Sequence, residues 1–246
     1  SPLSWAGPRR VHPPGIDFTD LPPIDAVFIS HNHYDHLDLP TIIRICKYHN
    51  ARVIVPLGNE KIILHHDSSI PVTAYDWGEG GDLSTNIKFV LQPVQHWSAR
   101  GLFDRNMALW GAYMIMTPAG NIYFAGDTGY GGGDCFRLTT EKFGPSFIAL
   151  LPIGCSKPEW FMQYQHMGPA EAVKAYYDLG QPFVLPTHHS AFPLADNGYA
   201  DPVDNLALAL ENDGRARKHF LLLAAGESYF FTGRKEVEHD MICSDC

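Results

Sequence analysis

Short hydrophobic runs alternate with helix-like patterns along the whole chain. Runs rich in Val, Ile, Leu, Phe and Tyr, bounded by Gly, Pro, Asn or Asp, are typical of buried β-strands. They predict strands over residues 26–29, 52–55, 87–94, 112–116, 122–125, 147–151, 183–185 and 219–223. Strands that alternate with helices in this way indicate an α/β domain.

Three segments carry the spacing of helices, at residues 40–48, 169–179 and 202–212. The second is the clearest, because Pro169 suits a first helical turn and Gly180 suits a C-terminal cap. Its apolar stripe consists of Ala172, Val173, Tyr176 and Leu179. In the third, Leu206 and Leu210 lie four residues apart. No repeat or linker interrupts the pattern, so we expect residues 1–246 to form a single domain, with 1–21 as an N-terminal loop and 235–246 as a flexible tail.

Composition restricts the class of protein. The chain has 246 residues, 45% of them hydrophobic, and a net charge of -9, which argues against a broad basic face for nucleic acid. No apolar run reaches the roughly 18–20 residues of a membrane span, and the N-terminus lacks the pattern of a secretion signal. We therefore expect a cytoplasmic or peripheral membrane location and no secretion. Because the chain begins at Ser1, we also expect the natural protein to extend further upstream.

The five cysteines are odd in number and scattered, which favours a reducing compartment over a disulfide framework. Cys243 and Cys246 form a single CxxC at the C-terminus. Without a second pair this motif is weak support for zinc, so a flexible tail is the favoured interpretation.

The strongest motif is the HxHxDH block formed by His31, His33, Asp35 and His36, directly after a strand-like run. In extended backbone His31 and His33 point to the same side, since side chains alternate. Asp35 and His36 follow where the chain turns towards the next helix. One short segment can thus supply two ligands to one metal and two to a second. Imidazole and carboxylate are the ligands expected for zinc or a similar divalent ion.

Further candidate ligands follow other predicted strands: His96 after 89–94, Asp127 after 122–125, and His188 after 183–185. Sites built beyond the carboxyl ends of strands show this arrangement. A lone histidine after a strand is usually a capped or surface residue, but the complete set in this order favours a binuclear metal site. Because a carboxylate has two oxygens, Asp127 is the natural bridging ligand.

With these residues the sequence resembles metallo-β-lactamase-fold hydrolases over about residues 22–230, and among them the N-acyl-phosphatidylethanolamine-hydrolysing phospholipase D family. HxHxDH marks only the superfamily. The resemblance to the phospholipase branch rests mainly on Gln95-His96-Trp97, Phe143-Gly144-Pro145 and Trp160-Phe161-Met162.

The resemblance implies an αββα sandwich with two Zn²⁺ at one edge between the sheets, although manganese and iron tolerate similar ligands. It assigns one zinc to His31, His33 and His96, the other to Asp35, His36 and His188, with Asp127 between them. It also places His166 near the substrate phosphate. Asp35, Asp127 and His166 are therefore the candidate catalytic residues.

The sequence departs from that family at two places. The family has a strand-rich segment before the position of Ser1, so the chain is expected either to be a fragment or to lack the first strands of its first sheet. The family also usually has Trp and Gly where this chain has His189 and Ser190. The shape of the pocket near the second metal is therefore expected to differ.

The expected chemistry is hydrolysis of a phosphodiester by a water that the two metals share and activate. Asp35 orients this water or accepts its proton, and His166 donates a hydrogen bond to the phosphate or protonates the leaving alcohol. N-acyl-phosphatidylethanolamine is the expected substrate, cleaved to a phosphatidic acid and an N-acylethanolamine.

Alternatives remain open at this stage. The same ligand set serves lactonases, RNA-cleaving enzymes and hydrolases of small phosphodiesters, and a non-catalytic metal-binding scaffold belongs to a different class. A homodimer and peripheral contact with a membrane are also left open. A groove for acyl chains is a further hypothesis; its candidate lining is Trp97, Leu102, Phe103, Trp160, Phe161, Met162 and Tyr164.

Overall fold

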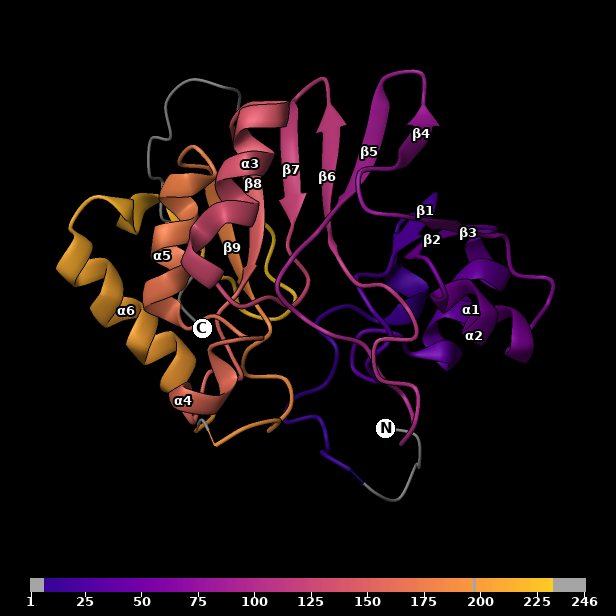
Figure 1. Cartoon of the computed structure of the whole chain (residues 1–246), viewed down its shortest axis with the longest axis horizontal. Helices are drawn as coiled ribbons and strands as arrows, with labels where there is room; N and C mark the ends of the chain where they lie inside the picture. Colours follow the sequence, from indigo (N-terminus) through magenta and orange to yellow (C-terminus); the bar gives the residue numbers. More distant parts are fainter. Residues whose placement is uncertain (1–6, 197, 232–246) are drawn as a thin grey trace.

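The computed structural model describes residues 7–196 and 198–231 and places two β-sheets between layers of helices (Figure 1). Within these ranges, no helix is both long and apolar enough to cross a membrane.

The smaller sheet is parallel and has the strand order β1-β2-β3, formed by Ala26–Phe28, Arg52–Pro56 and Val72–Tyr75. Two connecting helices, α1 (Leu39–His49) and α2 (Asn59–His66), lie beside it (Figure 1). Leu37, Ile42, Val53 and Ile63 belong to one buried cluster, which joins these helices to the sheet.

The larger sheet has the order β4-β5-β6-β7-β8-β9. Its strands are Gly80–Ser84, Ile87–Gln92, Ala112–Thr117, Gly120–Phe124, Ser146–Pro152 and Phe183–Thr187. The first four are antiparallel, whereas β8 and β9 continue in parallel from β7. Helices α3 (Asp134–Phe143), α5 (Pro169–Asp178) and α6 (Asp201–Asp213) lie on its outer side, and the short α4 (Glu159–Met162) precedes α5 (Figure 1).

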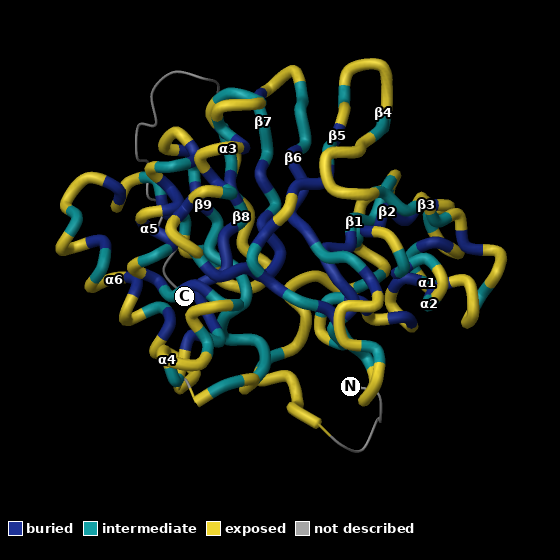
Figure 2. The backbone as a smooth tube through the Cα atoms, viewed as in Figure 1, coloured by how far each residue is buried: buried dark blue, intermediate teal, exposed yellow. Residues whose placement is uncertain are grey.

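The two sheets meet through a second apolar cluster around Phe89, Leu91 and Tyr113. The Phe28 ring lies edge-on to Phe89 at 5.1 Å, and the Tyr113 hydroxyl donates a hydrogen bond of 3.0 Å to the carbonyl of Ile29. The buried segments accordingly run through the middle of the molecule (Figure 2). The expected αββα sandwich is confirmed.

Most predicted elements are present, with ends within one or two residues of those expected. The prediction of a strand at 219–223 is wrong. A 3-10 turn at Ala216–His219 occupies its start, and only Phe220 forms a bridge, to Val184. The predicted N-terminal loop is irregular from residue 7, apart from the 3-10 turn Phe18–Asp20. The predicted tail at 235–246, with Cys243 and Cys246, lies outside the described residues.

Candidate metal centre

The candidate ligands reach one place from four separate loops. The segment after β1 supplies His31, His33, Asp35 and His36, and the loops after β5, β7 and β9 supply the other three. Their donor atoms form two groups that could each hold a metal ion: His31, His33 and His96 in one, and Asp35, His36, Asp127 and His188 in the other.

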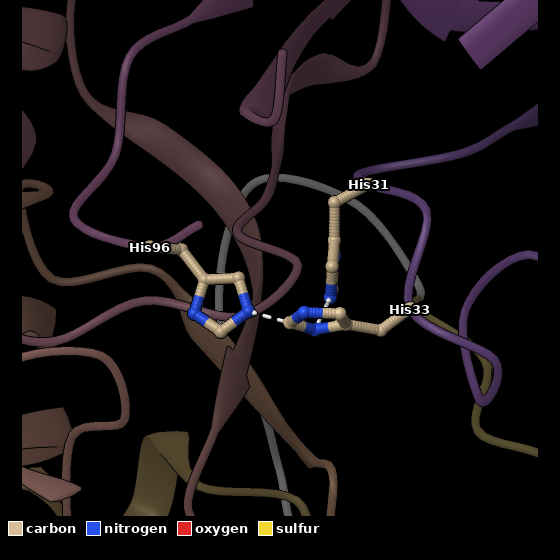
Figure 3. Close-up of side chains that lie close together, drawn as sticks. All are labelled: His31, His33 and His96. Carbon is tan, nitrogen blue, oxygen red and sulfur yellow. Dashed lines mark hydrogen bonds between the residues drawn. The ribbon is translucent and has the colours of Figure 1, made fainter. Parts of the chain in front are cut away.

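In the first group three ring nitrogens converge (Figure 3). The Nδ1 atom of His33 lies 2.9 Å from Nε2 of His31 and 3.3 Å from Nε2 of His96. Ligands bound tetrahedrally at roughly 2.0–2.1 Å from zinc are about 3.3 Å apart, so these separations suit a shared cation.

The second group is built around two carboxylate oxygens. Oδ2 of Asp127 lies 3.1 Å from Nε2 of His36 and 3.2 Å from Nε2 of His188. Oδ2 of Asp35 lies 3.3 Å from each of the same two nitrogens. All four separations are close to the tetrahedral spacing.

Asp127 belongs to the second group and also approaches the first. Its Oδ2 is 3.9 Å from Nε2 of both His31 and His96, in addition to its contacts with the second group. The residue is only 3% exposed, and its other oxygen, Oδ1, is buried without a hydrogen-bond partner. A buried carboxylate with an unused oxygen among imidazoles is suited to a cation.

Neighbouring groups orient two of the imidazoles. Nδ1 of His96 lies 2.9 Å from the carbonyl of Gln165, which selects the tautomer that donates from Nδ1 and leaves the Nε2 lone pair free. Nδ1 of His31 similarly meets the Ser30 hydroxyl at 3.0 Å. Both Nε2 atoms face the first group, as metal ligands require.

Burial keeps the first group neutral. It lowers the pKa of His31 and His33, and it lowers that of His96 to about 3. Neutral imidazoles offer lone pairs to a cation at pH 7, so the first group needs no proton loss to bind a metal.

The second group holds protons instead. Burial opposes charge on His36 and His188, but contact with Asp127 and Asp35 outweighs it and raises both pKa values, that of His36 to about 9. Burial alone would raise the pKa of Asp127. The neighbouring His188 and His36 outweigh this effect and lower the pKa of Asp127 below its usual range. A cation that binds here must displace protons.

Two glycines allow the loops to approach each other. Gly126 has a φ of 62°, and a Cβ there would lie 2.4 Å from Cβ of Ser30, next to His31. A Cβ on Gly154 would lie 1.9 Å from the carbonyl oxygen of His188. His188 itself has a φ of 57°, a conformation that non-glycine residues seldom adopt.

The other sequence-selected residues have different surroundings. His166 lies close to the cluster, with Nδ1 3.8 Å from Oδ2 of Asp127, and it forms a third candidate donor group with His96 and Asp127. Burial lowers its pKa to about 4. Of the proposed acyl groove, Phe103 and Trp160 are 96% and 73% exposed. These two side chains therefore lie on the surface.

Sequence reasoning missed Cys155. It lines one pocket together with His188, and it lies three residues after the end of β8, as the candidate ligands follow their strands. Its position shortly after a strand is the available signal, which neither the number of cysteines nor the CxxC spacing carries.

Comparison with known proteins agrees with this arrangement. The model of the "Beta-lactamase superfamily domain" matches residues 2–189. The "N-acyl-phosphatidylethanolamine-hydrolyzing phospholipase D 1" of Caenorhabditis elegans is 35% identical over 212 residues, 82% of this chain and 59% of the relative. The mitochondrial "N-acyl-phosphatidylethanolamine-hydrolyzing phospholipase D" of Saccharomyces cerevisiae is 33% identical over 214 residues, 85% of this chain and 45% of the relative. The chain thus spans about half the length of the curated relatives it matches.

Among solved structures, an isothiocyanate hydrolase from Delia radicum gut bacteria superposes with a TM-score of 0.66 at 16% identity, covering 88% of this chain and 80% of that one. Fold and donor cluster together define a metal-dependent hydrolase fold with a site that could bind metal. The chain belongs to the beta-lactamase superfamily.

Proposed function

We propose that the protein is a binuclear zinc hydrolase of phosphodiesters, of the phospholipase D type, which cleaves N-acyl-phosphatidylethanolamine-like lipids. The observation that carries the proposal is the pair of adjacent donor groups that meet at Asp127. Two relatives with this activity in their names, at 35% and 33% identity, support the choice of substrate.

His31, His33 and His96 would hold one cation, and Asp35, His36 and His188 the other, with Asp127 shared between them. Paired divalent cations lower the pKa of a water towards neutrality and offset the charge that grows on phosphoryl oxygens. Two other roles remain, which are to place the water and to place the substrate. Asp35 and His166 are the candidates for them.

Asp35 is the candidate for orienting the water. Its side chain is 25% exposed, whereas that of Asp127 is 2% exposed, so Asp35 is the carboxylate that solvent reaches. Hydrogen bonds from His188 and His36 overcome the effect of burial and hold its pKa below the usual range, which keeps it ionised at pH 7. An ionised carboxylate beside the reacting water accepts a hydrogen bond from it and fixes its direction.

His166 is the candidate for contact with the phosphate. Its ring stacks on His188 with centroids 5.5 Å apart, and its side chain is 11% exposed. From this largely buried position beside the cluster, a ring N–H can donate a hydrogen bond to a phosphoryl oxygen or to the oxygen of the leaving group.

The overall step balances with water as the only co-substrate. The oxygen of water forms a new bond to phosphorus, and the bond between phosphorus and the N-acylethanolamine oxygen breaks. One proton of the water is transferred to that leaving oxygen, and the other remains with the hydroxyl of the phosphatidic acid.

Release assays in ¹⁸O-water test this assignment. The zinc-loaded protein is incubated with N-acyl-phosphatidylethanolamine in mixed micelles, with an N-acyl-homoserine lactone and with a short RNA. We expect release of N-acylethanolamine, with ¹⁸O in the phosphatidic acid and none in the alcohol, and we expect a chelator to abolish it. Opening of the lactone or cleavage of RNA without phospholipid cleavage would overturn the phospholipase assignment. It would leave the assignment to metal-dependent hydrolases unchanged.

A further inference from the structure

A pocket of about 230 Å³ opens beside the second donor group. Asp35, His36 and His188 form its polar end. The remaining wall is mostly apolar and includes Val11, Ala191, Phe192, Pro193, Leu194 and Tyr199. We call it the His188 pocket.

Contacts with the N-terminal segment hold the wall in place. The backbone N–H of Val11 donates a 2.9 Å hydrogen bond to the carbonyl of Ala191, and the Arg10 guanidinium lies 5.5 Å from the centre of the Phe192 ring. The Ser190 hydroxyl donates to the carbonyl of Tyr199 at 3.2 Å. The loop after β9 is therefore held by contacts with the N-terminal segment and by a hydrogen bond within the loop itself.

The backbone around the pocket is strained. Cys155, His188 and Ser190 have φ angles of 58°, 57° and 55°, in the left-handed region that favours glycine. Such conformations persist only where surrounding contacts hold them, and they gather at functional sites. Here they shape the inner end of the pocket next to the donor group.

The chemistry of the pocket selects its occupant. The mostly apolar walls favour an apolar group. The volume is below the roughly 300–1,000 Å³ of pockets that enclose a drug-sized ligand, so it suits one arm of a lipid and not the whole molecule.

A second pocket reaches the cluster at His166 and differs in character. Its lining includes the polar residues Ser156, Lys157, Gln163 and Asn205. The two arms of a phosphodiester bound at the cluster would therefore meet unlike surroundings at the two openings.

We propose that the His188 pocket is a specificity subsite for the apolar arm next to the reacting phosphorus. This inference rests on the proposed function, because it takes the phosphorus to lie at the donor cluster. Phe192 and Leu194 are then specificity-determining residues, and the exposed Phe103 is not.

Binding of two phosphinates that cannot be hydrolysed tests the subsite. Hexyl(methyl)phosphinate and dimethylphosphinate are titrated calorimetrically into the zinc-loaded protein. Because each buried methylene favours binding, the wild type should prefer the hexyl compound by about tenfold or more. Phe192→Ala and the size-matched Leu194→Asn should each reduce that preference roughly three- to tenfold.

Phe103→Ala is the matched control, since this side chain is 96% exposed and does not line the pocket. It should keep the wild-type preference. Alkylation of Cys155, followed by peptide mass spectrometry, should be slowed more by the hexyl compound, because this thiol lines the same pocket.

Different failures have different meanings. Equal binding of both phosphinates by the wild type, or loss of the preference only in Phe103→Ala, overturns the subsite and leaves the proposed function standing. Failure of both phosphinates to bind overturns the proposed function, and the subsite with it.

Discussion

At the scale of single residues, the donor atoms depend on neighbours that bind no metal. The close approach of the Gly154 backbone to the carbonyl of His188 is one example, and Ser190 is another. Ser190 has a φ of 55° at the position where the resembled phospholipase family usually has Gly. The departure noted in the sequence thus falls on a strained position beside the candidate site.

Gly154→Ala should disturb the second donor group. Its Cβ would lie 1.9 Å from the His188 carbonyl oxygen, so one of the two loops must shift. We expect a loss of about 1–3 kcal/mol in unfolding free energy and weaker zinc binding. Chemical denaturation and a competitive zinc titration measure these effects.

Gly101→Ala provides the control, because a Cβ there has no neighbour nearer than 3.7 Å. It should change stability by less than about 0.5 kcal/mol. Equal effects of the two substitutions would contradict the argument from close approach.

The candidate ligands could be selected from the sequence because their chemistry and their positions after strands are both local features. The conformation of His188 could not, since a positive φ at this non-glycine residue depends on contacts with β8 and the loop after it. For Cys155 the sequence offers only its position after a strand, because its place beside His188 exists only in the fold.

At the scale of elements, the predicted strands that were found have strong hydrophobic patterns, whereas β4, which was not predicted, has none. β4 contains Gly80, Gly81, Asp82 and Ser84, residues with low strand propensity, and it forms by pairing with β5. Helix α2 buries only Asn59 and Ile63, so its periodicity is weak. Conversely, residues 219–223 have a strand-like composition but pair with β9 through a single bridge.

The start of α1 directly follows the HxHxDH loop, and Asp38 caps it. The Asp38 carboxylate accepts a 3.1 Å hydrogen bond from the backbone N–H of Thr41 and another from its hydroxyl. Asp38→Ala should lower the unfolding free energy by about 0.5–2 kcal/mol, measured by chemical denaturation. Asp38→Asn, which keeps an accepting oxygen, should recover most of it; an equally unstable Asn variant would argue against the cap.

At the scale of the whole molecule, the alternating elements predicted only the α/β class, and the resemblance implied the αββα layers. Neither predicted how the two unlike sheets pack against each other. Phe28 and Tyr113 come from different sheets, and their contact depends on the final arrangement. That residues 1–246 form a single domain stays a prediction.

The metal-free protein should be most stable near pH 6.5. Because the pKa values of His96 and His166 fall to about 3 and about 4 on folding, the unfolded chain takes up protons first as pH falls below 6.5, and stability decreases. The pKa of His36 rises to about 9, so its contribution is complete below 6.5 and is lost as pH rises through 9.

Thermal unfolding in chelator at pH 5, 6.5 and 9 measures this dependence. His36→Gln should reduce the alkaline decline, to which His188 also contributes, and leave the acidic one. A metal-free protein whose stability rises steadily from pH 5 to pH 9 would contradict the electrostatic description of the cluster.

The central claim is that Asp127 joins two cation sites, and the metal-to-protein ratio of wild type and Asp127→Asn tests it most directly. After zinc loading and gel filtration, mass spectrometry of the metal should give two zinc ions per wild-type chain. The Asn variant, which lacks the shared charge, should retain one or none and lose turnover. A wild-type chain with fewer than two, or an Asn variant that keeps both ions and full activity, would contradict the claim.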